Sequence, residues 1–200
     1  MNEKFFSLSG EKQNRMINAA VKVFAENGYE RAGTDAIVRE AGISKGLLFH
    51  YFGSKKNLYE FVTEYCVRYM TIELEDQVKS EDTNLFERIR LVEEAKLHML
   101  MLHPYLDLFL ISLGREDDPE VADLARQWYV ECEGIYSSLI DEKSDPAILK
   151  TGLTIADTHE LVAMCMDGYK MRRYTAGITP AEIISGFLPY LQILKENLCR

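Results

Sequence analysis

The segment from Ser44 to Tyr51 gathers hydrogen-bond donors and a cation, and it holds no carboxylate. Its polar side chains come from Ser44, Lys45, His50 and Tyr51, and Gly46 lies among them. Hydroxyl, ammonium and imidazole groups donate hydrogen bonds to anionic oxygens. A glycine inside a helix costs on the order of 1 kcal/mol relative to alanine, which favours a position where the backbone approaches another molecule closely. The chemistry that this segment suits is phosphate binding.

Two short helices separated by a glycine-containing turn are predicted to position these residues. The first is expected to run from a Thr34 cap to Gly42, and the second to begin at a Ser44 cap. Leu48 and Phe52, four residues apart, form the apolar side that anchors the second helix. This spacing is typical of a helix-turn-helix, whose second helix enters the major groove of DNA.

The charge of the chain divides at about residue 60. Residues 1–60 hold nine Lys and Arg against seven Asp and Glu, a net charge of +2, whereas residues 61–200 hold 14 against 25, a net charge of −11. An acidic body is repelled by nucleic acid, so any contact with DNA must be confined to the N-terminal part. The larger part must serve another purpose.

Apolar periodicity, capping residues and proline positions predict helices along the whole chain, with no internal repeat and no alternation typical of strands. The expected helices span about 10–27, 34–41, 45–52, 55–79, 84–102, a shorter segment ending near 113, 119–140, 157–175 and 180–198. The breaks fall at Gly28, at His103-Pro104, near Pro146 and at Gly177. The predicted fold class is therefore all-α.

The stretch from Thr34 to Tyr59, TDAIVREAGISKGLLFHYFGSKKNLY, resembles the signature of the TetR family of helix-turn-helix transcriptional regulators. The shared features are the Ala-Gly turn, Ser-Lys-Gly, the aromatic run ending in Phe52, and Ser-Lys followed by Leu-Tyr. The resemblance implies phosphate contacts from Thr34, Ser44, Tyr51 and Lys55, and base contacts from Lys45, Gly46 and His50. Phe49 stands where the family commonly has tyrosine, so only ring packing or contact with a thymine methyl remains there.

The resemblance is strong over about 50 residues and extends to the rest of the chain only in length and helix order. It implies a helix-turn-helix DNA-binding domain over residues 1–54 and a helical ligand-binding and dimerisation domain over residues 55–200. The implied function is a repressor that binds a palindromic, double-stranded operator as a homodimer. An unidentified small-molecule effector is expected to release it.

Aromatic residues of the acidic part are candidates for lining an effector pocket, although most such side chains form plain core. The candidates are Tyr69, His103, Phe109, Trp128, Tyr129 and Tyr169. The last two helices carry more apolar surface than a terminal hairpin can bury, which favours a dimer seam over packing within the chain. The candidates for that seam are Met164, Met171, Phe187, Leu191 and Leu194.

Other classes of protein are less consistent with the sequence. It contains no GxSxG, GxGxxG or GxxxxGK[ST] motif and no HExxH pair, so we expect no enzymatic activity, no cofactor and no metal site. Cys66, Cys132, Cys165 and Cys199 lie far apart, which favours reduced thiols over a redox sensor. With neither a membrane-length apolar segment nor a signal peptide, a cytoplasmic location is expected. A helical adaptor that binds only proteins remains the alternative.

Overall fold

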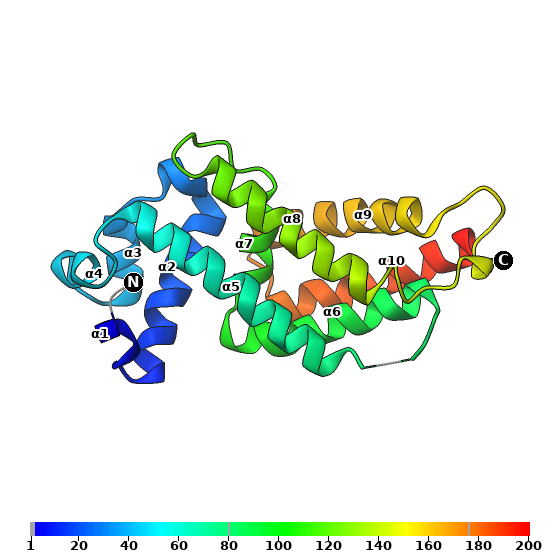
Figure 1. The fold of residues 1–200 in the computed structure, drawn as a ribbon, viewed down its shortest axis with the longest axis horizontal. Helices are drawn as coiled ribbons and strands as arrows, with labels where there is room; N and C mark the ends of the chain where they lie inside the picture. The colour runs from blue at the N-terminus through cyan, green and yellow to red at the C-terminus, as the bar shows by residue number, and fades with distance from the viewer. Residues whose placement is uncertain (1–2, 80, 176) are drawn as a thin grey trace. The chain divides into compact units, whose positions relative to one another are not determined.

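The computed structural model describes residues 3–79, 81–175 and 177–200, which form ten α-helices and one short 3-10 helix (Figure 1). No β-strand occurs among these residues beyond one isolated bridge, so the all-α prediction is confirmed. Contacts between Cα atoms divide the chain into two units. Unit 1 holds residues up to 69 together with 101–132, and unit 2 holds residues 70–100 and 133–200. The boundary after residue 54 stays a prediction.

Unit 1 is built around α2, which packs against α3 and α7. Its helices are α1 (Glu3–Phe6), α2 (Gly10–Arg31), α3 (Thr34–Ala41), α4 (Lys45–Phe52), the first part of α5 (Lys55–Gln77), α7 (Leu106–Leu113) and the first part of α8 (Ala122–Leu139). The apolar stripe of α2 is buried at Ile17, Ala20, Val21 and Phe24, as the periodicity predicts. Ala25, the fifth residue of the predicted stripe, is half-buried.

Three helix boundaries of unit 1 differ from the predicted ones. Gly28 has a φ of 70°, as expected for a glycine break, but helical turns resume after this kink and end at Arg31. The cap of α3 is Gly33, so the prediction that Thr34 caps this helix was wrong by one residue. Pro119 was expected in the first turn of a helix, whereas it lies in a turn and α8 begins at Ala122.

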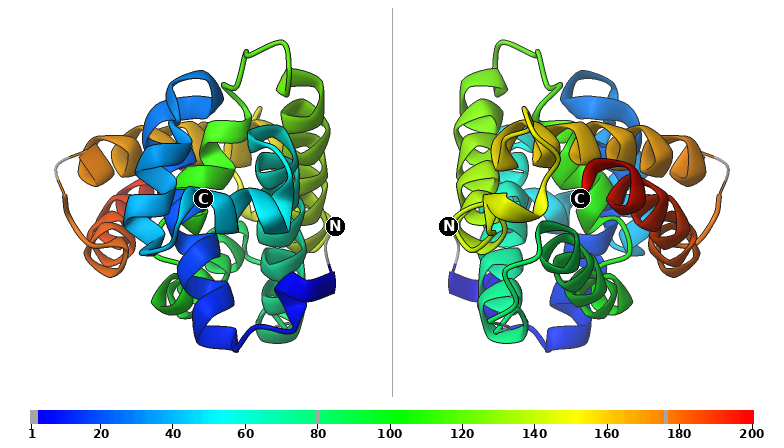
Figure 2. Two further views of the ribbon diagram at one scale, coloured as in Figure 1. Left: turned by 90° about the vertical axis from the view of Figure 1, so that its left-hand side faces the viewer. Right: turned by 90° about the vertical axis from the view of Figure 1, so that its right-hand side faces the viewer.

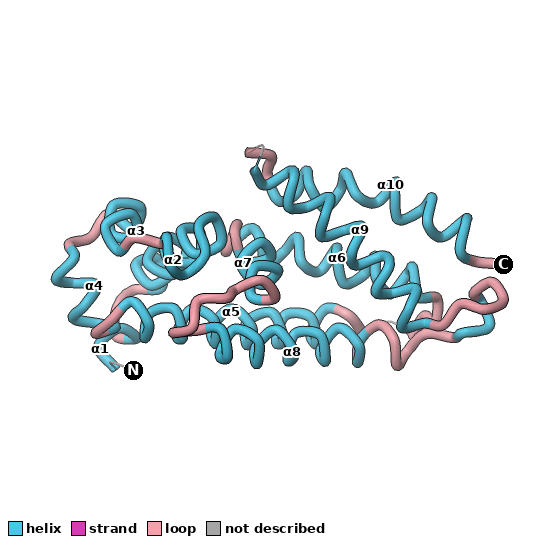
Figure 3. Tube along the Cα trace, turned by 90° about the horizontal axis from the view of Figure 1, so that it is seen from above, coloured by secondary structure: helices cyan, strands magenta, loops and turns pink. Residues whose placement is uncertain are grey.

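Unit 2 contains most of α6 (Leu85–Leu102), the 3-10 helix Pro146–Ile148, and the pair α9 (Ile155–Thr175) and α10 (Pro180–Leu198). The last two helices pack side by side as a hairpin (Figures 2 and 3). Thr179 caps α10 in a reciprocal capping box with Glu182, and Pro180 occupies the first turn. Gly186 leaves room for the Tyr169 hydroxyl, which a methyl group there would overlap.

Unit 2 also buries a cluster of charges. The Glu93 carboxylate lies 2.8 Å from the Lys96 amino group and 2.7 Å from that of Lys170, and all three side chains are at most 6% exposed. The Lys96 amino group also lies 4.5 Å from the centre of the Tyr136 ring. Burying charge is costly unless partners offset it, so these contacts fix α6 against α9 and α8.

Candidate nucleic-acid interface

The helix α4 is held at its N-terminal end and along its apolar side. The Ser44 hydroxyl accepts a hydrogen bond of 3.2 Å from the backbone N–H of Leu47, which confirms the predicted cap. Gly42 takes a left-handed conformation, with φ 64° and ψ 38°, and so permits the tight turn before α4. Leu48 and Phe52 are buried, as their spacing predicts. Lys45, Gly46 and Leu47, at the start of α4, are exposed beside this anchor.

The outward face of α4 is polar at its N-terminal end. Ser44, Lys45, Gly46 and His50 are all exposed, and α4 carries no acidic residue. A Cβ atom added to Gly46 would meet no heavy atom within 4 Å, so close packing within the chain does not explain the glycine. Leu47 is also exposed, at 37%, and sequence reasoning missed it. The adjacent pair Leu47-Leu48 could have predicted this exposure, because only one of two consecutive leucines on a helix can face the core.

Lys45 forms an ion pair with α3. Its amino group lies 2.9 Å from a carboxylate oxygen of Asp35, and both side chains are more than half exposed. Asp35 occupies the first turn of α3, where a negative charge also favours the helix dipole. An exposed pair of this kind contributes about 0–1 kcal/mol. A phosphate can therefore take the place of Asp35 at little cost.

Residues 16–62 match the sequence profile described as "Bacterial regulatory proteins, tetR family". The fold is similar to that of a TetR family transcriptional regulator from Chloroflexus aurantiacus J-10-FL, with a TM-score of 0.68 at 21% identity. That likeness covers 100% of this chain and 98% of the other. Residues 16–62 thus match the TetR family, and the chain shares the fold of that solved structure.

Two curated relatives match part of the chain. The HTH-type transcriptional activator FasR of Mycolicibacterium smegmatis is 33% identical over 85 residues, which are 42% of this chain and 38% of FasR. The biofilm operon icaADBC HTH-type negative transcriptional regulator IcaR of Staphylococcus aureus is 32% identical over 94 residues, which are 44% of this chain and 50% of IcaR. The chain thus spans about two fifths to one half of the lengths of these relatives. One relative is named as an activator of transcription and the other as a negative regulator.

Lys55 has a structural role that the sequence did not indicate. Its amino group donates to the backbone oxygens of Tyr29 at 3.0 Å and Glu30 at 3.4 Å, and it lies 4.1 Å from the centre of the Tyr29 ring. A cation at the C-terminal end of a helix satisfies its open carbonyls. A phosphate bound by Lys55 would have to replace these contacts, so Lys55 is a weaker candidate for DNA binding than Lys45.

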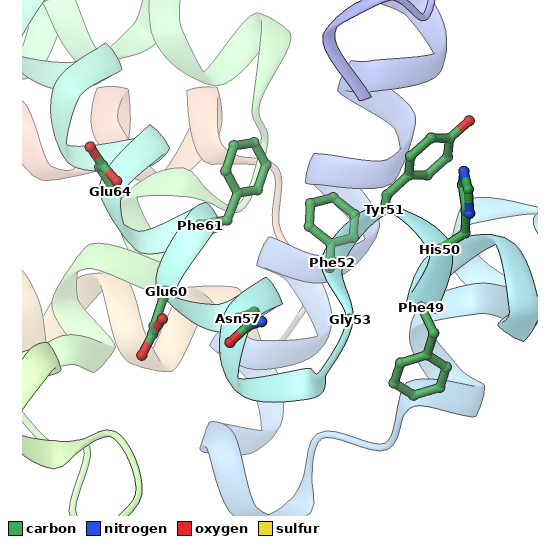
Figure 4. A pocket seen from close by; sticks show the side chains of 9 residues that line it. All are labelled: Phe49, His50, Tyr51, Phe52, Gly53, Asn57, Glu60, Phe61 and Glu64. Atoms are coloured by element: carbon green, nitrogen blue, oxygen red, sulfur yellow. The ribbon is translucent and has the colours of Figure 1, made fainter. Parts of the chain in front are cut away.

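The C-terminal end of α4 borders a groove of about 380 Å³ (Figure 4). Phe49 and Tyr51 of α4 line it together with Phe61, Glu60 and Glu64 of α5. In Figure 4 the two carboxylates point away from His50 and Tyr51. Their negative charge opposes phosphate binding on the α5 side. The groove therefore marks an edge of the candidate interface, with half-buried Phe49 and Tyr51 along it.

The predicted effector-pocket residues fall into separate groups. Tyr69 and His103 are in contact, with ring centroids 5.0 Å apart, in unit 1. Phe109 is fully buried against Tyr59, and Tyr129 packs on Gly114. Trp128 is half-buried on α8. Tyr169 belongs to unit 2, where it contacts Phe187 and Tyr190 of α10. Only Tyr69 and His103 among these residues contact each other, and the effector pocket stays a prediction.

The residues predicted to form the dimer interface differ in how far they are exposed within the single chain. Met164 is 60% exposed, and Met171 and Leu194 are half-buried, whereas Phe187 and Leu191 are at most 4% exposed within the chain. Sequence reasoning missed three other apolar side chains of α9 and α10 that face solvent. They are Leu161, Tyr190 and Ile193. An exposed apolar face on this hairpin is therefore made of different residues from most of those expected.

The cysteines are all free thiols, and Cys66 and Cys132 are buried. Burial raises the pKa of the Cys66 thiol, which disfavours the reactive thiolate. Among the described residues no three His, Cys, Asp or Glu side chains are grouped as metal ligands. No helix in the described part of the chain is long and apolar enough to cross a membrane.

Proposed function

We propose that this protein is a ligand-responsive repressor that binds a palindromic operator as a homodimer and is released by a small-molecule effector. The observation that carries the proposal is the exposed, carboxylate-free N-terminal end of α4, presented by a helix-turn-helix. Ser44, Lys45, Gly46 and His50 would face the major groove, with Thr34 and Tyr51 at flanking phosphates. Leu47 adds an apolar tip suited to a thymine methyl.

Homodimer formation is supported by the exposed apolar face of α9 and α10. Leu161 and Met164 lie three residues apart on α9, and Tyr190 and Ile193 lie three residues apart on α10, so each pair shares a helix face. All four side chains are at least 41% exposed. Two copies of this hairpin would form a four-helix seam about a two-fold axis. The same axis would present two copies of α4 to an inverted repeat.

Release by an effector requires a coupling free energy between ligand and operator. A tenfold to hundredfold loss of operator affinity corresponds to a preference of about 1.4 to 2.7 kcal/mol for the released state. Tyr69 and His103, which are in contact near the α6–α7 junction, would be the residues of unit 1 that an effector displaces. The match to IcaR, a negative regulator, supports repression. By reciprocity, operator DNA would weaken effector binding by the same factor.

The ion pair between Lys45 and Asp35 offers a test of DNA binding at α4. We expect Lys45→Ala to weaken binding to operator DNA by about threefold to tenfold and to lower the salt slope by about one counterion. Asp35→Asn should have the opposite effect and strengthen binding by about twofold to threefold, because it frees Lys45 for phosphate. Fluorescence anisotropy over a range of salt concentrations measures both.

Two controls distinguish the effect of the Lys45 ion pair from the effect of a change in net charge. In the Lys45→Ala background, Asp35→Asn should no longer strengthen binding, because the two effects arise from one pair. Glu40→Gln removes an equal charge from the same domain, where Glu40 pairs with Lys22 at 2.8 Å. If Glu40→Gln strengthened binding as much as Asp35→Asn, the proposed role of the Lys45 pair would be wrong. Unchanged binding by Lys45→Ala would reject Lys45 as a contact of DNA.

A further inference from the structure

The short helix α1 is held against the DNA-binding helices by one aromatic side chain. Phe5 is fully buried, and its ring centroid lies 5.1 Å from that of Phe52 in α4 and 5.3 Å from that of Phe61 in α5. It also meets the Tyr51 ring of α4 edge to face, with centroids 5.9 Å apart. A helix of four residues is not stable alone, so the burial of Phe5 holds α1 in place.

Hydrogen bonds from the start of α2 tie down the segment that follows α1. The Gln13 side-chain amide donates to the backbone oxygens of Leu8 at 2.8 Å and Phe6 at 3.3 Å. The backbone N–H of Leu8 donates to the Phe5 oxygen at 3.2 Å. The position of Phe5 is therefore fixed by its own burial and by Gln13, all within unit 1. Phe5 lies outside residues 16–62, which match the family profile, so that match assigns it no role.

Tyr51 is the residue of the candidate interface that Phe5 contacts. The Tyr51 side chain is half-buried, and in Figure 4 its hydroxyl points away from Phe52 and Phe61. A tyrosine side chain on a helix has more than one allowed rotamer, so a neighbouring ring can select one of them. Phe5 meets the Tyr51 ring from α1, and His50 meets it from α4 with ring centroids 5.3 Å apart. The Tyr51 ring is therefore held in part by a segment outside the helix-turn-helix.

We propose that Phe5 is a positioning residue for DNA binding, which holds the Tyr51 side chain in the orientation that lets its hydroxyl donate to a phosphate oxygen. The inference rests on the proposed operator binding, in which Tyr51 lies at a flanking phosphate. Phosphate contacts fix the register of a protein on the duplex, and tyrosine hydroxyls are among the groups that make them. A mobile Tyr51 ring would have to be ordered when DNA binds, which lowers affinity. Phe5 avoids this loss because it orders the ring beforehand.

A double-mutant cycle on DNA affinity tests this role. The probe is the duplex that the wild type enriches from a random-sequence pool, and fluorescence anisotropy measures its binding. We expect Phe5→Ala to lower affinity by about fivefold to tenfold, and Tyr51→Phe to lower it by a similar factor. In the Tyr51→Phe background, Phe5→Ala should lower affinity by about twofold or less, because the contact that Phe5 supports is already absent. Phe5→Leu, which refills most of the buried space, should stay within about threefold of the wild type.

Phe6→Ala is the matched control, since Phe6 is the neighbouring ring of α1, is 52% exposed and meets Phe61 of α5 at a centroid distance of 6.2 Å. It should bind the duplex within about twofold of the wild type. If Phe5→Ala were unfolded by circular dichroism, Gln13→Ala would decide, because it releases the same segment without opening a cavity in the core. Its loss of affinity should be smaller and should also vanish in the Tyr51→Phe background.

The outcomes separate the role of Phe5 from operator binding itself. Equal losses from Phe5→Ala in the two backgrounds would overturn the proposal, because Phe5 would then support the fold and not the Tyr51 contact. A Tyr51→Phe variant with the affinity of the wild type would overturn it as well. A folded wild type that enriches no duplex would instead reject the proposed function.

Discussion

Gly46→Glu should abolish operator binding, lowering affinity by on the order of 100-fold or more, while the protein stays folded. The substitution places bulk and negative charge at the exposed start of α4, where phosphates would lie. The fold should gain slightly in stability, because glutamate is a better helix former than glycine and its charge suits a first turn. Space for the side chain is open, since no heavy atom lies within 4 Å of an added Cβ. DNA titration and thermal unfolding separate the two effects.

Gly134→Glu provides the matched control for this prediction. Gly134 is an exposed glycine within α8, and a Cβ atom added there also meets nothing within 4 Å. The same gain in helix propensity should follow, without any loss of DNA binding. If the Gly46 variant were folded and bound operator as the wild type does, α4 would not be the face that meets DNA. Equal losses in both variants would point to net charge alone.

Ile193→Glu should convert the dimer into a folded monomer and reduce operator affinity by about 100-fold or more, because two linked half-site contacts become separate binding events. Ile193 is 54% exposed on α10, so the single chain should tolerate the charge. The interface between two copies should not tolerate the charge, because an unpaired carboxylate would be buried there. Sedimentation measures the oligomeric state, and circular dichroism measures the retained helicity.

Ile72→Glu is the control for the seam, since Ile72 is 65% exposed on α5, away from α9 and α10 in the sequence. It should leave both dimerisation and operator binding intact. Phe187 and Leu191, which the sequence suggests for this experiment, are unsuitable because they are buried within the chain. Charge at either would unfold unit 2 as well as break a seam. A dimer that survived Ile193→Glu would show that the interface lies on another face.

The helices were predictable where local chemistry determines them. The stop at His103-Pro104, the Ser44 cap and the start at Thr179-Pro180 were all confirmed, because each depends on residues within one turn. The four-residue helix α1 was missed, since it is too short to show a period. Its Phe5 is fully buried, with ring centroids 5.1 Å from Phe52 and 5.3 Å from Phe61. Only the tertiary fold brings these rings together.

The candidate site shows the same division between local and distant contacts. The exposed donors on α4 follow from the spacing of Leu48 and Phe52 within a single helix. The ammonium of Lys55 lies on backbone oxygens 25 and 26 residues away, a contact that no local pattern indicates. Apolar periodicity likewise marked Phe187 as buried, but it could not say whether this chain or a second copy buries it.

Selection of bound fragments from genomic DNA tests the central claim most directly, because it asks without prior assumption whether the chain reads DNA and with what symmetry. We expect enrichment of an inverted repeat whose half-site centres lie about one helical turn apart, or slightly more. Gly46→Glu should enrich nothing above background. A direct repeat would contradict the two-fold arrangement of α4 helices. The absence of any enriched sequence with folded, dimeric wild-type protein would contradict operator binding itself.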